Sequence, residues 1–128
     1  MDSKTLQQLV LEAKSEIVEV DLAKVREVSQ DRSQLIVDVR EPSEFAQGHI
    51  EGAINIPRGV LEFRTDPNYP GSIPSLYDKS AEIILYCRSG ARSALAAQSL
   101  VVLGYKAVVS MAGGYLAWEE EKLPVVTS

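Results

Sequence analysis

Residues 83–92 read Ile-Ile-Leu-Tyr-Cys-Arg-Ser-Gly-Ala-Arg, and they give the clearest indication of the fold class. Its apolar first part predicts a buried strand, and the Ala- and Leu-rich pattern from Ala91 to Leu103 predicts a helix that ends at Gly104. The short loop between them begins with Cys87, the only cysteine of the chain. A buried strand followed directly by a helix is the building unit of a parallel α/β sheet, and such sheets bind ligands at the carboxyl ends of their strands. Cys87 therefore lies where a functional group is expected.

Strands and helices alternate on both sides of this unit. Further strands are expected at residues 17–20, 35–39, 53–56 and 107–111. Helices are expected at residues 3–14 with Ser3 as N-cap, after Asp21, after Pro42 and after the Gly113-Gly114 turn. Residues 58–78 are the least regular part: one helical turn is expected at residues 60–63, and the prolines and glycine that follow predict a surface loop. The alternation predicts a three-layer α/β domain whose central, mostly parallel five-stranded sheet is flanked by helices.

The length and charge of the chain limit its functions. A length of 128 residues suits a single domain over 1–128, with a core over about 17–123 and an N-terminal helix over about 3–14. The net charge of −5 argues against binding to nucleic acid, which requires a basic face. No apolar run approaches the roughly 20 residues that span a bilayer, so no membrane association is expected. The first residues lack the pattern of a secretory signal, and a single cysteine suits a reducing compartment, so we expect a cytoplasmic protein.

The loop has the pattern C-x4-R, from Cys87 to Arg92. A sulfur at a helix N-terminus meets free backbone N–H groups and the positive end of the helix dipole, and Arg88 and Arg92 add positive charge nearby. All three influences favour the thiolate, which is the nucleophilic form of cysteine. Ser89 and Gly90 are small enough for the backbone to close around an anion, and the Arg92 guanidinium is expected to bind that anion at two points.

The chain resembles the rhodanese-like sulfurtransferases over nearly its whole length, from about Val18 to Leu123. Several segments match motifs of that family in order along the chain: Asp38-Val39-Arg40-Glu41 with Glu44-Phe45, Gly48-His49-Ile50-Glu51-Gly52-Ala53-Ile54-Asn55-Ile56-Pro57, Cys87 to Ser93, Gly104-Tyr105, and Gly113-Gly114-Tyr115-Leu116-Ala117-Trp118. Each segment alone is a weak signal, but the ordered set at these spacings is specific. The resemblance implies a rhodanese-like three-layer fold.

The resemblance also implies a persulfide mechanism that needs no organic cofactor and no metal. Cys87 would attack the outer sulfur of a donor such as thiosulfate, and cyanide or a thiol would then remove that sulfur from the persulfide. Within the family, a basic residue directly after the cysteine suits thiosulfate, and Arg88 occupies that position. The expected partners are a small anionic sulfur donor and a cyanide or thiol acceptor, with a protein donor or acceptor as an alternative. The loop residues implied around the sulfur are Arg88, Ser89, Gly90, Ala91, Arg92 and Ser93.

Three other functions fit parts of the pattern. A persulfide relay protein would use Cys87 in the same way but deliver the sulfur to a partner in cofactor or tRNA thiolation. Non-catalytic interaction modules with this fold commonly lack the cysteine, which this chain keeps. Cysteine phosphatases have a loop one residue longer, C-x5-R, and tend to carry His before the cysteine, where this chain has Tyr86. Both departures argue against phosphatase or arsenate reductase activity.

Four charged residues outside the loop are candidate neighbours of the pocket: Asp38, Arg40, Arg58 and Arg64. The first two form a charged group at a strand end with Glu41 and Glu44. For this group we favour an ion-pair network that locks the strand to a helix, with Asp38 as the better candidate for a pocket neighbour. Arg58 and Arg64 either recruit an anionic donor or are solvated surface charges. We take the surface role as the default for both. His49 is expected to be structural rather than a general base. The amphipathic first helix is expected to cover the sheet, with docking to another protein as the alternative.

Overall fold

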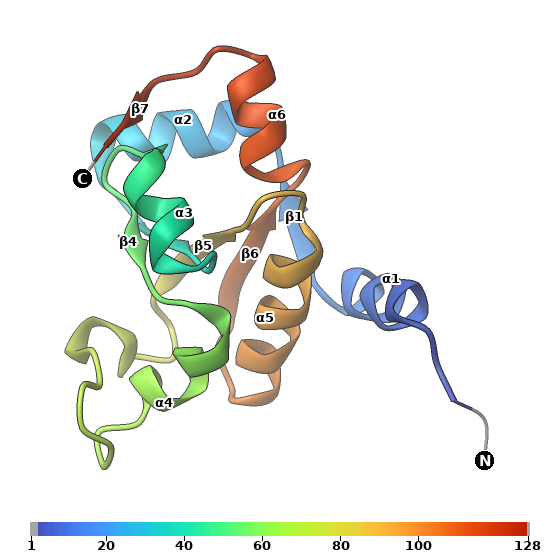
Figure 1. Cartoon of the computed structure of the whole chain (residues 1–128). Coiled ribbons are helices and arrows are strands. Elements are labelled where there is room, and N and C mark those ends of the chain that lie inside the picture. Colours follow the sequence, from blue (N-terminus) through green and yellow to red (C-terminus); the bar gives the residue numbers. More distant parts are fainter. Residues whose placement is uncertain (1–2, 128) are drawn as a thin grey trace.

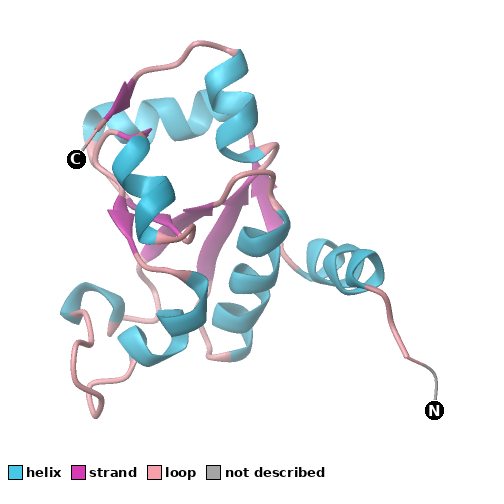
Figure 2. Ribbon diagram, viewed as in Figure 1, coloured by secondary structure: helices cyan, strands magenta, loops and turns pink. Residues whose placement is uncertain are grey.

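Five parallel strands form the central sheet, in the order β1-β6-β5-β2-β4. The structure is a computed structural model, and it describes residues 3–127. β5 lies in the middle of the sheet, so the strand that leads into Cys87 has a hydrogen-bonded neighbour on each side (Figure 2). The α/β architecture with a parallel five-stranded sheet is confirmed. The strands are β1 (Val18–Val20), β2 (Leu35–Asp38), β4 (Ile54–Asn55), β5 (Glu82–Tyr86) and β6 (Ala107–Met111).

Helices cover both faces of the sheet (Figure 1). On one face lie α4 (Leu61–Thr65) and α5 (Ala91–Val102), and on the other lie α2 (Leu22–Asp31) and α6 (Gly114–Glu120). The sheet therefore separates two apolar cores, which we call the α5-side core and the α6-side core. Strands buried on both faces are apolar at every position, which explains why residues 83–86 show no alternation of polar and apolar side chains.

Successive residues of β5 enter opposite cores because side chains alternate along a strand. Leu85 and Cys87 belong to the α5-side core, whereas Ile84 and Tyr86 belong to the α6-side core. The side chain of Cys87 consequently points toward the face on which the next helix, α5, is packed. The position of the cysteine one residue after the strand thus decides on which face of the sheet its sulfur lies.

The first helix, α1 (Leu6–Glu16), packs against α5, and Gln98 of α5 donates a hydrogen bond of 2.9 Å to Glu16. The expected N-cap at Ser3 is wrong. Thr5 caps the helix instead: its hydroxyl accepts from the Gln8 N–H at 3.1 Å, and the Gln8 side chain accepts from the Thr5 N–H at 2.8 Å. This reciprocal capping box satisfies two backbone donors at once, which a cap at Ser3 could not do.

Short elements account for the remaining differences from the sequence prediction. The strand expected at residues 53–56 is paired only at Ile54–Asn55. A two-stranded antiparallel sheet, β3 (His49–Ile50) with β7 (Val125–Val126), was not predicted, because two residues are too few to show a periodicity. As expected, Pro42 begins α3 (Pro42–Gln47), and the helical turn expected at residues 60–63 is present as the start of α4. The 3-10 turns η1 (Arg58–Val60) and η2 (Pro74–Leu76) add further helical structure, so residues 58–78 contain less loop than the sequence indicated. Within residues 3–127, no helix has the length and apolar character that a membrane crossing requires.

Candidate active site

Cys87 is buried, with 1% of its surface exposed, at the junction of β5 and α5. Two backbone N–H groups donate to its sulfur: that of Gly90 at 3.1 Å and that of Ser93 at 3.3 Å. Hydrogen bonds donated to a sulfur stabilise the thiolate relative to the thiol. The expected anion-binding loop is therefore present around Cys87, and the amides aimed at the sulfur are those of Gly90 and Ser93.

The first turn of α6 holds the loop in this orientation. Two backbone N–H groups of this turn donate hydrogen bonds to loop carbonyls: that of Tyr115 to the Cys87 carbonyl at 2.8 Å, and that of Leu116 to the Arg88 carbonyl at 3.0 Å. These two carbonyl oxygens are therefore directed at α6, and the start of the loop is tied to the first turn of that helix. Gly114 permits the close approach, since a Cβ at this position would lie 2.4 Å from the Arg88 oxygen. The absence of a side chain at Gly114 thus allows the first turn of α6 to pack directly against the loop backbone.

The Arg92 guanidinium was expected to bind an anion in the loop, but in the structure it is bound to another side chain. Its two terminal nitrogens bind the Glu44 carboxylate, with Nη1 to Oε1 at 2.8 Å and Nη2 to Oε2 at 3.1 Å. The hydrogen bonds from Arg92 lower the pKa of Glu44 to about 2, and the same contact raises the pKa of Arg92. The expectation failed because Glu44, 48 positions away in the sequence, supplies a bidentate partner. Arg92 therefore joins α5 to α3 at the edge of the site.

Asp38 and Arg40 form a buried ion pair below the same opening. Arg40 Nη2 lies 2.6 Å from Asp38 Oδ2, and it also donates to the Gly48 carbonyl at 2.7 Å. The Arg40 guanidinium lies over the Tyr115 ring, 4.2 Å from its centroid. The favoured structural role of this pair is confirmed, but the choice of Asp38 as pocket neighbour is wrong. Asp38 is fully buried beneath the Arg40 side chain, and Arg40 is the member of the pair that lines the pocket.

A polar pocket of about 210 Å³ opens beside the loop. It contains both positive and negative side chains, and Arg88 is its exposed arginine. No salt bridge is formed by Arg88 among residues 3–127. Arg88 is thus the loop arginine that remains available to an anionic ligand. The pocket is lined by Arg40, Glu44, Gln47, Gly48, Arg88, Tyr115 and Glu119.

Arg58 and Arg64 do not line this pocket. Arg58 is exposed in η1, and Arg64 donates to the Gly71 carbonyl at 2.6 Å within the irregular region. Both belong to the surface, as the default interpretation held. His49 is buried against Phe45, with stacked rings 3.6 Å apart and its Nδ1 2.9 Å from the Phe45 carbonyl. These contacts agree with the structural role predicted for this histidine.

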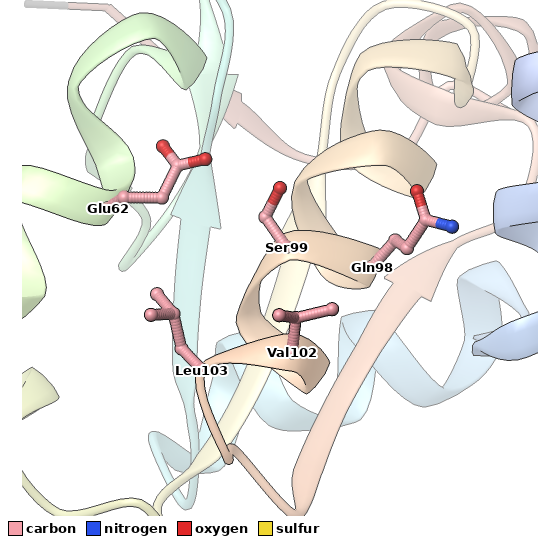
Figure 3. A pocket seen from close by; sticks show the side chains of 5 residues that line it. All are labelled: Glu62, Gln98, Ser99, Val102 and Leu103. Atoms are coloured by element: carbon pink, nitrogen blue, oxygen red, sulfur yellow. The ribbon is translucent and has the colours of Figure 1, made fainter.

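A second hollow, of about 270 Å³, lies between α4 and α5. Figure 3 shows that Glu62 approaches it from α4, whereas the other labelled side chains belong to α5 and to Leu103, which follows this helix. Its lining contains no cysteine, histidine or arginine, so we assign no chemistry to it. Within residues 3–127, no group of three His, Cys, Asp or Glu side chains is arranged to hold a metal ion.

Sequence reasoning missed two features of the site. One is the pair of α6 amides that bind the loop carbonyls, and the other is Ser110 of β6, whose hydroxyl donates to Ser93 at 2.8 Å. Ser110 interrupts an otherwise apolar strand pattern over residues 107–111, and that interruption was the available signal.

Comparison with known proteins gives a consistent assignment. Residues 21–121 match the model of the rhodanese-like domain. Thiosulfate sulfurtransferase 18 of Arabidopsis thaliana is 35% identical over 120 residues, covering 88% of this chain and 85% of that protein. Among solved structures, the human single-domain sulfurtransferase has a TM-score of 0.71 at 31% identity, covering 80% of this chain and 96% of that one.

A further solved structure has a different description. A protein of unknown function from Rhodopseudomonas palustris, described as a possible tyrosine phosphatase, has a TM-score of 0.89 at 31% identity and covers 98% of this chain and 97% of its own. The matched domain and the relatives named as sulfurtransferases support sulfurtransferase activity at the level of the family. The strand–loop–helix around Cys87 and these matches lead to one assignment: the chain belongs to the rhodanese-like family.

Proposed function

We propose that this protein is a thiosulfate sulfurtransferase that carries the transferred sulfur on Cys87. The thiolate attacks the outer sulfur of thiosulfate and forms a new S–S bond. The old S–S bond breaks, its electron pair leaves with sulfite, and Cys87 remains as an anionic persulfide. Cyanide or a thiolate then attacks the outer sulfur of that persulfide, and the bonding pair returns to Cys87 as thiolate. Both half-reactions begin and end with an anionic sulfur at residue 87.

The observation that carries the proposal is the convergence of the Gly90 and Ser93 amides on the Cys87 sulfur, at 3.1 and 3.3 Å. These donors are fixed in place before the reaction by α5 and by the bonds that α6 makes to the loop. Preorganised donors around a charge that persists through a reaction are a large source of catalysis. The amides stabilise the thiolate and the persulfide in the same way, which suits a transfer in two steps.

Thiosulfate is the favoured donor because positive charge is available at the pocket. Arg88 is exposed there and follows the nucleophile directly, whereas the charge of Arg40 in the same pocket is offset by Asp38. Arg92 contributes less than the sequence suggested, because its charge is offset by Glu44. We therefore assign the electrostatic recognition of thiosulfate mainly to Arg88.

The cytoplasmic location also stays a proposal, based on the single unpaired cysteine.

A phosphatase activity is less well supported by the geometry. The loop has four residues between Cys87 and Arg92, and the Arg92 fork that would hold a phosphate is bound to Glu44. Sulfur transfer places a single sulfur, rather than a tetrahedral phosphate, within the loop. Hydrolysis of p-nitrophenyl phosphate at a rate comparable to sulfur transfer would favour the phosphatase instead.

The direct test is the intact mass of the protein after exposure to thiosulfate. A persulfide adds about 32 Da, and subsequent cyanide should remove that mass and release thiocyanate. Cys87→Ser is the matched control, because it keeps the side-chain size and removes the thiol. Mass gain from a cysteine desulfurase but not from thiosulfate would identify a relay protein. Absence of mass gain with every donor would leave a non-catalytic module.

A further inference from the structure

A chain of two buried hydroxyl groups lies beneath the nucleophile. The Ser110 hydroxyl donates to Ser93 Oγ at 2.8 Å, and Ser93 Oγ lies 3.5 Å from the Cys87 sulfur. Ser93 and Ser110 have no exposed surface, and Cys87 has 1%. The three side chains come from three elements: β6, α5 and the loop after β5.

Ser110 occupies a position where an apolar side chain would pack more simply. Its Cα partner in β5 is Leu85, whose side chain enters the α5-side core, as does that of Val108 two residues earlier. A buried hydroxyl without a hydrogen-bond partner destabilises the fold, so this position requires a specific acceptor. That acceptor is Ser93 Oγ, and no other hydrogen bond of the Ser110 side chain occurs within residues 3–127.

Ser93 has one hydroxyl hydrogen and two acceptors within reach. These are the Gly90 carbonyl at 3.3 Å and the Cys87 sulfur at 3.5 Å. When Cys87 is a thiol, its S–H donates to Ser93 Oγ. When Cys87 is a thiolate, the sulfur can only accept, so the Ser93 hydroxyl must reverse its role and donate. The Ser110 hydroxyl donates to the Ser93 oxygen in both states.

We propose that Ser110 is a positioning residue for sulfur transfer, because its donated hydrogen bond directs the Ser93 hydroxyl toward the anionic sulfur of Cys87. The sulfur thereby gains a third donor beside the Gly90 and Ser93 amides. A donated hydrogen bond also polarises the receiving hydroxyl and strengthens its own donation. Without Ser110, the Ser93 oxygen loses this donated bond, and its hydroxyl donates less strongly to the anionic sulfur, which favours the unreactive thiol. This inference rests on the proposed function, since sulfur transfer requires an anionic Cys87.

Replacement of Ser110 should leave the charged and titratable groups near Cys87 in place. They come from its own loop, from α5, from α3, from β2 with its following residues, and from α6. No hydrogen bond or salt bridge connects any of them to Ser110 within the described chain. A change in the pH dependence of Cys87 reactivity therefore reports the hydroxyl chain. These groups are Arg88, Arg92, Glu44, Asp38, Arg40 and Tyr115.

The test compares Ser110→Thr with Ser110→Val. Threonine and valine have the same shape and both suit a strand, but only threonine keeps the hydroxyl. The readout is the rate of Cys87 alkylation by iodoacetamide as a function of pH, measured on the whole chain. We expect Ser110→Val to move the rise of this profile to higher pH and to lower the rate at neutral pH by about fivefold. Ser110→Thr should retain the original profile. Identical profiles for the two variants would overturn the proposal.

Two further variants separate positioning from packing. Ser110→Ala, which removes the hydroxyl without adding a branch, should follow Ser110→Val; an unchanged profile would contradict the proposal. Ser29→Ala is the matched control. Ser29 is a buried residue of α2, and its hydroxyl donates to the Glu51 carbonyl at 2.7 Å. This variant should lose a comparable buried hydrogen bond and leave the alkylation profile unchanged. If the alkylation profile of Ser29→Ala shifted as far as that of the Ser110 variants, the effect would be due to general destabilisation and the proposal would be overturned.

A double-mutant cycle tests whether Ser110 acts through Ser93. If it does, Ser93→Ala combined with Ser110→Val should have the same profile as Ser93→Ala alone. Effects of the two substitutions that multiply would show that Ser110 acts by another route and would overturn the proposal. Alkylation requires no sulfur donor, so it also distinguishes this inference from the proposed function. Loss of the persulfide mass gain with thiosulfate would refute the proposed donor and leave the alkylation result intact.

Discussion

The role of α6 in holding the loop can be tested by adding one methyl group at Gly114. An alanine Cβ there would lie 2.4 Å from the Arg88 oxygen, 2.6 Å from the Arg88 carbonyl carbon and 2.7 Å from the Ser89 nitrogen. All three are backbone atoms, and ordinary contact begins at 3.4 Å, so the loop and α6 must separate by up to 1.0 Å. That separation weakens the bonds from α6 to the Cys87 and Arg88 carbonyls.

The displacement reaches the nucleophile through the backbone. The loop carbonyls bound by α6 precede the Gly90 and Ser93 amides, which are 3.1 and 3.3 Å from the sulfur. A misplacement of about 1 Å in a catalytic arrangement reduces rates by roughly 100-fold, which equals about 2.7 kcal/mol of activation free energy. We therefore expect Gly114→Ala to form the Cys87 persulfide about 100-fold more slowly than the original protein.

Gly104→Ala is the matched control for backbone strain. Gly104 has a φ of +99° and Gly114 a φ of +63°, so alanine is disfavoured at both positions. A Cβ at Gly104, however, would have no neighbour within 4 Å. Both variants should lose about 1–2 kcal/mol of folding free energy from the left-handed backbone, but only Gly114→Ala should lose activity.

The assay is thiocyanate formation from thiosulfate and cyanide, with thermal unfolding measured on the same samples. Full activity in Gly114→Ala, at a temperature where it is folded, would refute the view that α6 positions the loop. An equal loss of activity in Gly104→Ala would attribute the effect to backbone strain in general.

Three further predictions concern single side chains. Cys87→Ser should abolish the mass gain of about 32 Da from thiosulfate while the thermal unfolding curve stays cooperative; any residual gain would place the sulfur elsewhere. Arg88→Ala should raise the KM for thiosulfate by about 10-fold and change the reaction of an uncharged donor little, with Arg58→Ala, on the surface outside the pocket, as control; an equal loss with both donors would contradict the charge argument. Because Arg92 lowers the pKa of Glu44 from 4.5 to about 2, the stability from this pair is present above pH 4.5 and is lost as the pH falls toward 2. The midpoint of urea unfolding should therefore decrease more between neutral pH and about pH 3 in the original protein than in Glu44→Gln; equal decreases would show that the pair adds no stability.

Much of the site was predictable because its main parts are neighbours along the chain. The strand before Cys87, the tight turn at Gly90 and the start of α5 follow from apolar runs, small residues and helix-forming residues within about ten positions. The same holds for the end of α5 at Gly104 and for Pro42 at the start of α3. The N-cap of α1 also had a local signal, the spacing of Thr5 and Gln8, which the choice of Ser3 overlooked.

The order of the residues was enough to predict the α/β class, the family motifs and the place of Cys87 between a buried strand and a helix. The side chains that surround the sulfur became known from the folded arrangement. It joined Arg92 to Glu44 across 48 positions, Ser93 to Ser110 across 17, and the loop carbonyls to the first turn of α6. Local structure depends on the propensities of adjacent residues, whereas an arginine or a hydroxyl takes whichever partner packing brings within hydrogen-bond distance. That choice is made when the helices dock on the sheet, and it has no local pattern in the sequence.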